Sequence, residues 1–196
     1  MAARKKLPED VQAILSASDA GYHALTAELA SAYLQDHETG IRGWLDLGHS
    51  LAQLFRYDEA QAAFVKAIEL SEAPCDVALG ELGNLCRAQG NLAGAADWYR
   101  KQIDADPEDA TGLLFLGRLE LARGNRAAAR EAFLAGLERP HGVLEELHYG
   151  LGLVERSEAN YAAAKKQFEQ ALELDPKHDA AKVALKDVKS VLNRDA

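Results

Sequence analysis

Residues 44–70 read WLDLGHSLAQLFRYDEAQAAFVKAIEL, and this stretch predicts two helices joined by a turn at residues 55–57. Apolar and small residues recur at helical spacing in its first half, namely Trp44, Leu47, Gly48 and Leu51. The second half repeats that spacing with Ala60, Phe64, Ala67 and Ile68. Because Gly48 and Ala60 are small, the two helices can approach closely while the larger side chains seal the contact. The stretch therefore predicts a helical hairpin.

The same pattern recurs three more times along the chain. The pair Leu47-Gly48 returns as Leu82-Gly83, Leu116-Gly117 and Leu151-Gly152, at spacings of 35, 34 and 35 residues. The order Trp, Leu-Gly, Tyr, Ala, Phe, Ala resembles the tetratricopeptide repeat (TPR), a helix-turn-helix unit of roughly 34 residues. The resemblance implies an all-α fold, a right-handed superhelical solenoid whose repeats span 41–74, 76–109, 110–143 and 145–178.

The segments on either side of the repeats have predictions of their own. Residues 1–6 are basic and predict a mobile tail, and residues 7–40 predict a helical pair that is a degenerate TPR-like hairpin. The alternative for this pair is a helix that folds over the array or reaches a partner. Residues 179–196 carry one apolar face and predict a capping helix, because a terminal repeat must cover its last apolar surface.

Two repeats depart from the family pattern at a position that is usually alanine. Repeat two has Gln102 there and repeat three has Gly136, so looser packing is expected at both points. Proline and glycine within residues 139–144 predict a bend between repeats three and four.

Composition narrows the class of protein. The chain has 196 residues, of which 48% are hydrophobic, so a sizeable core is available, and its formal net charge of −9 argues against a nucleic-acid partner. No apolar run is long enough for a signal peptide or for insertion into a membrane. Cys75 and Cys86 lack metal-type spacing and are interpreted as free thiols in a reducing compartment. These features predict a cytoplasmic protein that needs no cofactor.

The resemblance places a binding site on the concave face of the solenoid, which the first helix of each repeat lines. The positions carried over to this sequence are Arg42, Leu45, His49, Asn84, Arg87, Leu114, Arg118, Leu121, Tyr149, Leu153 and Arg156. Arginine pairs with carboxylates at two points, and the leucines and tyrosine add apolar contact area. The list predicts a protein or peptide partner that is acidic or has apolar anchors. The alternative is that these arginines serve solubility or pair with neighbouring glutamates.

Two more specific functions occur among TPR proteins: binding of acidic chaperone tails, and chaperone activity toward a client protein. TPR co-chaperones that bind acidic chaperone tails share a carboxylate clamp, and only Asn84 matches its pattern here, so that clamp is excluded. The resemblance then implies a non-catalytic adaptor or scaffold, with a homodimer also allowed. The alternative is a chaperone-like TPR protein for a secreted or assembling client.

Enzymatic hypotheses depend on the histidines. Glu145 and His148 have the spacing found in di-iron helix bundles, but two such motifs are required and the chain offers one. His148 also falls at the repeat position of Trp44, which favours a packed interior side chain. A histidine-based metal-dependent enzyme is therefore the least favoured hypothesis, and no catalytic or metal-binding residue is predicted.

Overall fold

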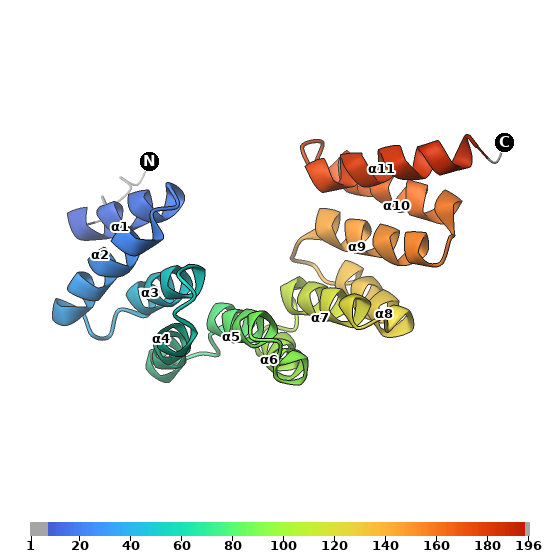
Figure 1. The fold of residues 1–196 in the computed structure, drawn as a ribbon. Coiled ribbons are helices and arrows are strands. Elements are labelled where there is room, and N and C mark those ends of the chain that lie inside the picture. The colour runs from blue at the N-terminus through green and yellow to red at the C-terminus, as the bar shows by residue number, and fades with distance from the viewer. Residues whose placement is uncertain (1–7, 195–196) are drawn as a thin grey trace, which may run out of the picture. The chain divides into compact units, whose positions relative to one another are not determined.

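The computed structural model describes residues 8–194, and these residues form helices without any β-strand (Figure 1). The predicted tail at residues 1–6 lies outside the described range. The helices are α1 (Glu9–Asp19), α2 (His23–Asp36), α3 (Ile41–Gln53), α4 (Tyr57–Leu70), α5 (Asp76–Ala88), α6 (Leu92–Ala105), α7 (Thr111–Ala122), α8 (Arg126–Leu137), α9 (Leu144–Ser157), α10 (Tyr161–Leu174) and α11 (Asp179–Leu192). The predicted all-α class is confirmed.

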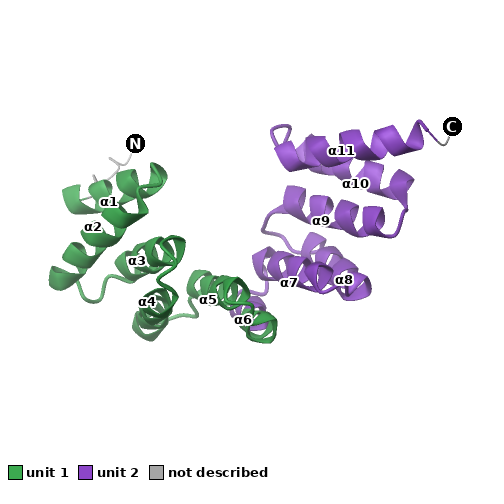
Figure 2. Ribbon diagram, in the orientation of Figure 1, with its two compact units in different colours: residues 1–98 green, residues 99–196 purple. Residues whose placement is uncertain are grey.

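From α1 to α5 and from α7 to α11, consecutive helices pack against one another, and the chain divides into two compact units (Figure 2). The first unit ends at Trp98 and the second begins at Tyr99, so the boundary falls within α6. In the first unit α2 packs on α3 and α3 on α4; in the second, α7 packs on α8, α9 on α10 and α10 on α11. Short connections between neighbours in space are the expected result of a helix-turn-helix repeat.

One turn geometry recurs between the two helices of every hairpin. Its residue with positive φ is in turn Gly21, Phe55, Gly90, Gly124 and Ala159, at spacings of 34, 35, 34 and 35 residues. In each turn the next residue donates its N–H back across the helix end, as Arg56 does to the Leu51 carbonyl and Asn160 to the Glu155 carbonyl. The left-handed conformation costs a residue with a β-carbon roughly 1–2 kcal/mol, so glycine is favoured there.

Three of the repeats join a glycine of the first helix to an aromatic ring of the second. A β-carbon on Gly48 would lie 2.7 Å from the Phe64 ring, closer than packed atoms allow. In the second unit Gly117 faces Phe133 and Gly152 faces Phe168 in the same way. All three rings are fully buried. The predicted packing of a small residue on one helix against a large residue on its partner helix is present in both units.

The expectation of loose packing at Gly136 is wrong. A β-carbon there would meet Leu147 Cδ2 of α9 at 2.7 Å, and Leu147 is fully buried. The missing methyl group is therefore what allows α9 to pack closely on α8. Gln102 is also buried, since its side chain is 5% exposed. Unlike a well-packed alanine, it leaves a polar atom unpaired, because its Oε1 accepts no hydrogen bond within residues 8–194.

The junction between α8 and α9 is held by charged groups. Arg130 of α8 donates to Glu155 of α9 at 3.0 Å and to Glu158 at 2.7 Å. Hydrogen bonds to Glu158 and then Glu155 raise the pKa of the Arg130 guanidinium above its usual value, and Arg130 lowers the pKa of Glu158. The loop before α9 also pairs with the chain ahead of α7, where the Ala110 N–H donates to the His141 carbonyl.

The last helix covers the end of the second unit. Ala184 and Val188 of α11 are buried in one cluster with Ala164 and Phe168 of α10. His178 precedes α11 and accepts a hydrogen bond from the Ala181 N–H through Nδ1 at 3.4 Å, which caps the helix.

Candidate functional site

The residues predicted for the concave groove fall on both units, and they form two separate sets. We call Arg42, Leu45, His49, Asn84 and Arg87 the first surface, on α3 and α5. We call Leu114, Arg118, Leu121, Tyr149, Leu153 and Arg156 the second surface, on α7 and α9.

Part of the first surface borders a cavity of about 260 Å³. The lining comes from α1, α3, α4 and α5 and comprises Ser18, Arg42, Leu45, Asp46, His49, Phe64, Val77 and Glu81. Arg42 is engaged within its own helix, because its Nε donates to the two carboxylate oxygens of Asp46 at 2.9 and 3.0 Å. A pair spaced by four residues on one helix face is a local interaction, so Arg42 is only partly free to meet a partner.

His49 lines this cavity and is its one histidine. Its Nδ1 lies 3.6 Å from Oε1 of Glu81 on α5, and its ring lies edge-on to the His23 ring at 6.3 Å. The hydrogen bond to Glu81 raises the pKa of His49, burial opposes that rise, and the Asp46 carboxylate adds to it. His49 therefore gains a proton more readily than an isolated histidine.

Arg87 completes the first surface at the end of α5. Its side chain is exposed and forms no ion pair with any residue in the described range 8–194. Asn84, one helical turn earlier, is oriented toward Glu81 with Nδ2 and Oε2 3.4 Å apart. An unpaired arginine beside a half-buried polar side chain is suited to accept a carboxylate from outside.

The second surface is built around Glu146 of α9. Arg118 of α7 forms an ion pair with Oε2 of Glu146 on α9. The same oxygen lies 3.5 Å from Nε2 of His178, whose side chain is 9% exposed. Because Nδ1 of His178 accepts the capping hydrogen bond, the neutral ring carries its proton on Nε2, toward Glu146. Arg118 is thus the donor that holds the Glu146 carboxylate, whereas Nε2 of His178 lies nearby but makes no hydrogen bond among the described residues.

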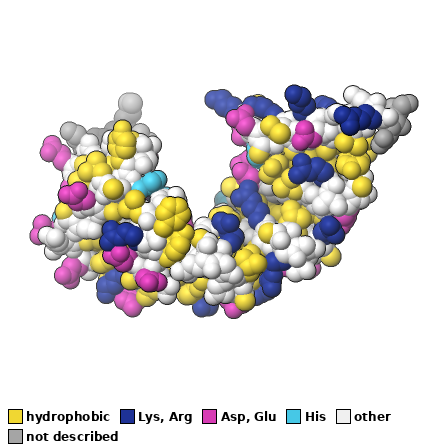
Figure 3. All heavy atoms as spheres, viewed as in Figure 1, with side chains coloured by type: hydrophobic (Ala, Val, Ile, Leu, Met, Phe, Trp, Pro, Cys, Tyr) yellow, Lys and Arg dark blue, Asp and Glu magenta, His cyan; other side chains and the backbone are white. Residues whose placement is uncertain are grey.

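Aromatic packing supports this arrangement. The Tyr149 ring lies 4.8 Å from the His178 ring and 5.8 Å from the Phe168 ring, measured between centroids. Leu153 and Tyr149 are half-buried and pack against the cluster around Phe168. Figure 3 shows basic side chains on the visible face over the region of α7 and α9. The second surface therefore combines exposed charge with partly accessible apolar area.

Leu114 does not belong to an accessible surface. It is 3% exposed and lies in the buried cluster of Phe133, Leu147 and Leu151. Leu121 is half-buried at the edge of the same cluster. Arg156 is exposed on α9 and makes no ion pair with residues that the structure describes. We retain Arg118, Leu121, Tyr149, Leu153 and Arg156 as the accessible part of the second surface.

The alternative that groove arginines pair with nearby acids holds for two of the four. Arg42 pairs with Asp46 and Arg118 with Glu146, whereas Arg87 and Arg156 have no such partner among the described residues. The pairing of Arg42 with Asp46 can be predicted from the sequence, because the two residues are four positions apart on one helix. The contact of Arg118 with Glu146 spans 28 residues and has no local pattern.

The histidines and cysteines show no arrangement for metal chemistry. Within residues 8–194 no group of three or more histidine, cysteine, aspartate or glutamate side chains is placed to hold a metal ion. His148 instead has its Nδ1 2.8 Å from Oε1 of Gln167. Cys75 and Cys86 are free thiols, and burial raises the pKa of Cys86. In the same range, no helix combines the length and apolar character needed to cross a bilayer.

Comparison with known families agrees with the repeat geometry. Residues 45–110 and residues 145–178 each match a family model described as tetratricopeptide repeat. The chain belongs to the tetratricopeptide repeat family. The TPR fold is a protein-interaction fold and is typically non-enzymatic.

A curated human relative of this TPR protein is protein O-mannosyl-transferase TMTC3, which is 30% identical over 174 residues. The alignment covers 81% of the chain, and the chain spans only 19% of the length of that relative. The enzymatic name therefore describes a much longer protein.

Solved TPR structures share the fold at low sequence identity. The chain matches the Cut9–Hcn1 complex of the APC/C with a TM-score of 0.73 at 17% identity, over 92% of this chain and 35% of that one. It matches TTC0263 of Thermus thermophilus with a TM-score of 0.70 at 16% identity, over 91% and 96% of the two chains. YrrB, described as a TPR protein with an unusual peptide-binding site, matches with a TM-score of 0.58 at 18% identity, over 88% of each chain.

Proposed function

We propose that this TPR protein is a non-catalytic adaptor that binds an acidic, carboxylate-bearing segment of another protein on its first-helix faces. The observation that carries the proposal is the state of Arg87 and Arg156. In a chain with a net charge of −9, both are exposed and without an ion-pair partner in the described range. Each guanidinium offers a planar fork that matches a carboxylate.

Arg118 can join this surface by exchanging its partner. Its ion pair with Glu146 is solvent-accessible, since the two side chains are 44% and 32% exposed. Such pairs contribute only about 0–1 kcal/mol to stability, so a carboxylate from a partner can replace Glu146 at low cost. Tyr149 and Leu153 then provide apolar contact beside the charge, which is the usual anatomy of a peptide-binding face.

The fold and the comparisons support a peptide or extended segment as the ligand class. TPR helices present side chains in a regular row along the solenoid, which suits a linear partner. The similarity to YrrB, whose described feature is a peptide-binding site, fits this class of ligand.

The proposal can be tested by affinity capture followed by direct titration. The wild-type chain and the Arg87→Glu/Arg156→Glu variant are used to capture proteins, and an acidic peptide from each specifically retained protein is then titrated by fluorescence anisotropy. We expect the variant to lose at least tenfold in affinity, since each arginine reversal replaces attraction by repulsion. The matched control is Lys166→Glu/Lys186→Glu, which makes the same change in net charge on α10 and α11. Equal loss in both variants would show a general charge effect and contradict the proposed site.

A further inference from the structure

Phe55 is the least expected side chain at its position in the fold. It occupies the left-handed turn between α3 and α4 with φ 61°, where the equivalent residues of three other hairpins are Gly21, Gly90 and Gly124. Its side chain is nonetheless 77% exposed, so the backbone strain is not offset by burial within the chain. A bulky residue held in this conformation points to a role outside local folding.

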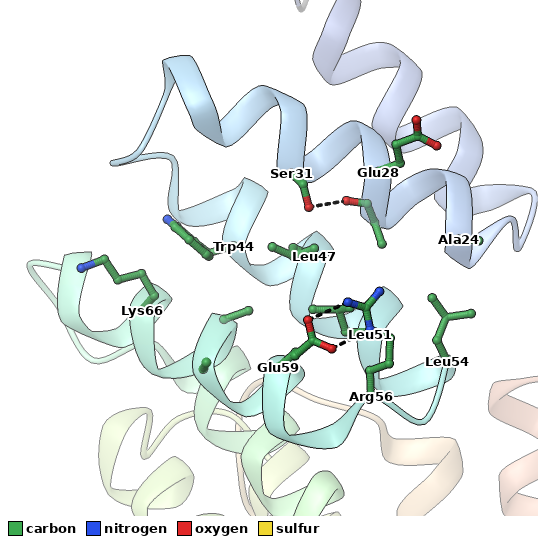
Figure 4. Close-up of a pocket in the computed structure, with 13 residues that line it drawn as sticks. Ala24, Glu28, Ser31, Trp44, Leu47, Leu51, Leu54, Arg56, Glu59 and Lys66 are labelled. Carbon is green, nitrogen blue, oxygen red and sulfur yellow. Dashed lines mark hydrogen bonds and ion pairs between the residues drawn. The ribbon is translucent and has the colours of Figure 1, made fainter.

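A cavity of about 560 Å³ lies directly beside this turn (Figure 4). Its floor is apolar and is formed by Trp44, Leu47 and Leu51 of α3 and by Leu54, which follows the end of that helix. Its walls carry alanines of α2 and α4, namely Ala24, Ala27, Ala62 and Ala63. Leu54 and Arg56, the two chain neighbours of Phe55, both line the cavity, whereas the Phe55 ring lies edge-on to Tyr57 at 6.1 Å. An exposed aromatic side chain and an apolar cavity therefore belong to the same helical hairpin and are neighbours along the chain.

The rim of the cavity indicates what kind of partner it suits. Two acids and two bases border it, Glu28, Arg56, Glu59 and Lys66, and Arg56 is paired with Glu59 at 2.6 Å. The rim thus has no net charge, although the whole chain carries −9. Two copies of so acidic a chain repel each other across most surfaces, and a neutral rim is where a second copy meets the least repulsion. A strongly acidic or basic partner gains no attraction there.

We propose that this surface forms a two-fold homodimer in which Phe55 of each copy inserts into the cavity of the other. A cavity of roughly 150 Å³ is sufficient to hold a benzene ring, so the space here accommodates the Phe55 ring together with part of its turn. Because Phe55 and the cavity belong to the same hairpin, a two-fold axis beside the turn makes the two insertions equivalent and closes the assembly at two copies.

Sedimentation velocity on the full chain over a wide concentration range tests the dimer. We expect the wild type to shift from monomer to dimer as concentration rises, and Phe55→Gly to remain monomeric throughout. At low concentration, where both are monomers, Phe55→Gly should melt at a higher temperature, because glycine accepts the left-handed turn without strain. Ala159→Gly is the matched control, since Ala159 has φ 60° in the equivalent turn of the second unit. It should raise the melting temperature and leave the dimer intact.

A complementation experiment separates the two halves of the contact. Ala62→Trp fills the cavity but retains Phe55, whereas Phe55→Gly removes the plug but retains the cavity. Each variant alone should be monomeric, and an equimolar mixture should recover a heterodimer weaker than the wild-type dimer. A wild type that stays monomeric up to its solubility limit, or a Phe55→Gly variant that dimerises like the wild type, would overturn the proposal. Failure of the mixture to associate would overturn the reciprocal insertion.

Discussion

At the residue scale, the glycines that face aromatic rings show why this chain places glycine, a poor helix former, in the middle of helices. Glycine in a helix interior costs about 1 kcal/mol relative to alanine. Gly48, Gly117 and Gly152 all lie within helices and each touches a buried phenylalanine ring. The close approach of the two helices, which lets the ring fill the space over the glycine, offsets that cost.

Replacing Gly48 by alanine is expected to destabilise the first unit by about 1–3 kcal/mol, because the new methyl group forces the buried Phe64 ring to move. Urea denaturation followed by circular dichroism measures the change. Gln53→Ala, an exposed substitution on the same helix, is the control and should change the stability by less than about 0.5 kcal/mol. An unchanged or raised stability in Gly48→Ala would show that the ring contact is dispensable.

The His49–Glu81 pair predicts a titration that can be observed directly. Because Glu81 raises the pKa of His49, the pair contributes its stability fully at pH below about 6.5 and loses it as the pH rises through the raised value. Glu81→Gln should therefore lower the pKa of His49 toward that of an ordinary histidine. An NMR titration of the imidazole resonances gives both values, and identical pKa values in the two proteins would disprove the interaction.

At the element scale, the junctions between hairpins depend on contacts of different kinds. The α10–α11 contact has an apolar centre, with Ala184 and Val188 packed on Phe168, and an exposed ion pair between Lys189 and Glu169. The α8–α9 contact combines Leu147 over Gly136 with the Arg130 ion pairs. Apolar contacts are insensitive to pH, whereas the ion pairs of Arg130 require ionised carboxylates.

Arg130→Met is expected to cost up to about 1 kcal/mol at neutral pH, since the ion pairs are partly exposed and water screens them. The pKa of Glu158 is lowered in the folded chain, so the stabilisation is present at neutral pH and disappears as the pH falls through that lowered value. The stability difference between Arg130→Met and wild type should accordingly vanish in acid. Arg139→Met, which removes a nearby arginine without an ion pair among the described residues, should show no such pH dependence.

Removal of residues 179–196 tests the last helix. Without α11, the buried cluster around Ala164 and Phe168 becomes exposed to water. We expect the truncated chain to unfold at lower urea concentration and to bind a hydrophobic dye, because a terminal hairpin needs a cover for its apolar face. A truncated chain that keeps wild-type stability and binds no dye would contradict a capping role for α11.

The sequence anticipates contacts that lie within one repeat far better than contacts between repeats. The pairing of Gly48 with Phe64 follows from a pattern that recurs every 34 or 35 residues. Leu114 was misplaced because α7 carries leucines on nearly all sides, so its inward face cannot be identified from periodicity. The contact of Arg118 with Glu146 depends on rotamers of side chains 28 residues apart, which no spacing rule reports.

At the scale of the whole molecule, the net charge of −9 acts in opposite directions on the two proposed interactions. Binding of an acidic segment to exposed arginines is an attraction between charges, and salt weakens it. Association of two acidic copies through apolar groups works against repulsion, and salt reduces that repulsion.

Raising the ionic strength should therefore weaken the binding of an acidic peptide and leave the Phe55-dependent dimer unchanged or stronger. Anisotropy titrations and sedimentation velocity in the same buffers measure both effects, since the Debye length falls to about 10 Å at 0.1 M salt. If salt weakens the dimer as well, its contact must depend on charge rather than on Phe55. If salt leaves peptide binding unchanged, the arginines are not its basis.

The recurrence of one turn every 34 or 35 residues also has a mechanical consequence. The most extensive helix–helix contacts join neighbours or next neighbours along the chain, so a hairpin can detach with little loss of contact to distant segments. A chain stretched from its two ends should thus lengthen by steps rather than in one rupture. Each hairpin released adds about 34 residues of extended polypeptide, or roughly 120 Å of contour length. The array would then behave under load as a series of springs that open one hairpin at a time.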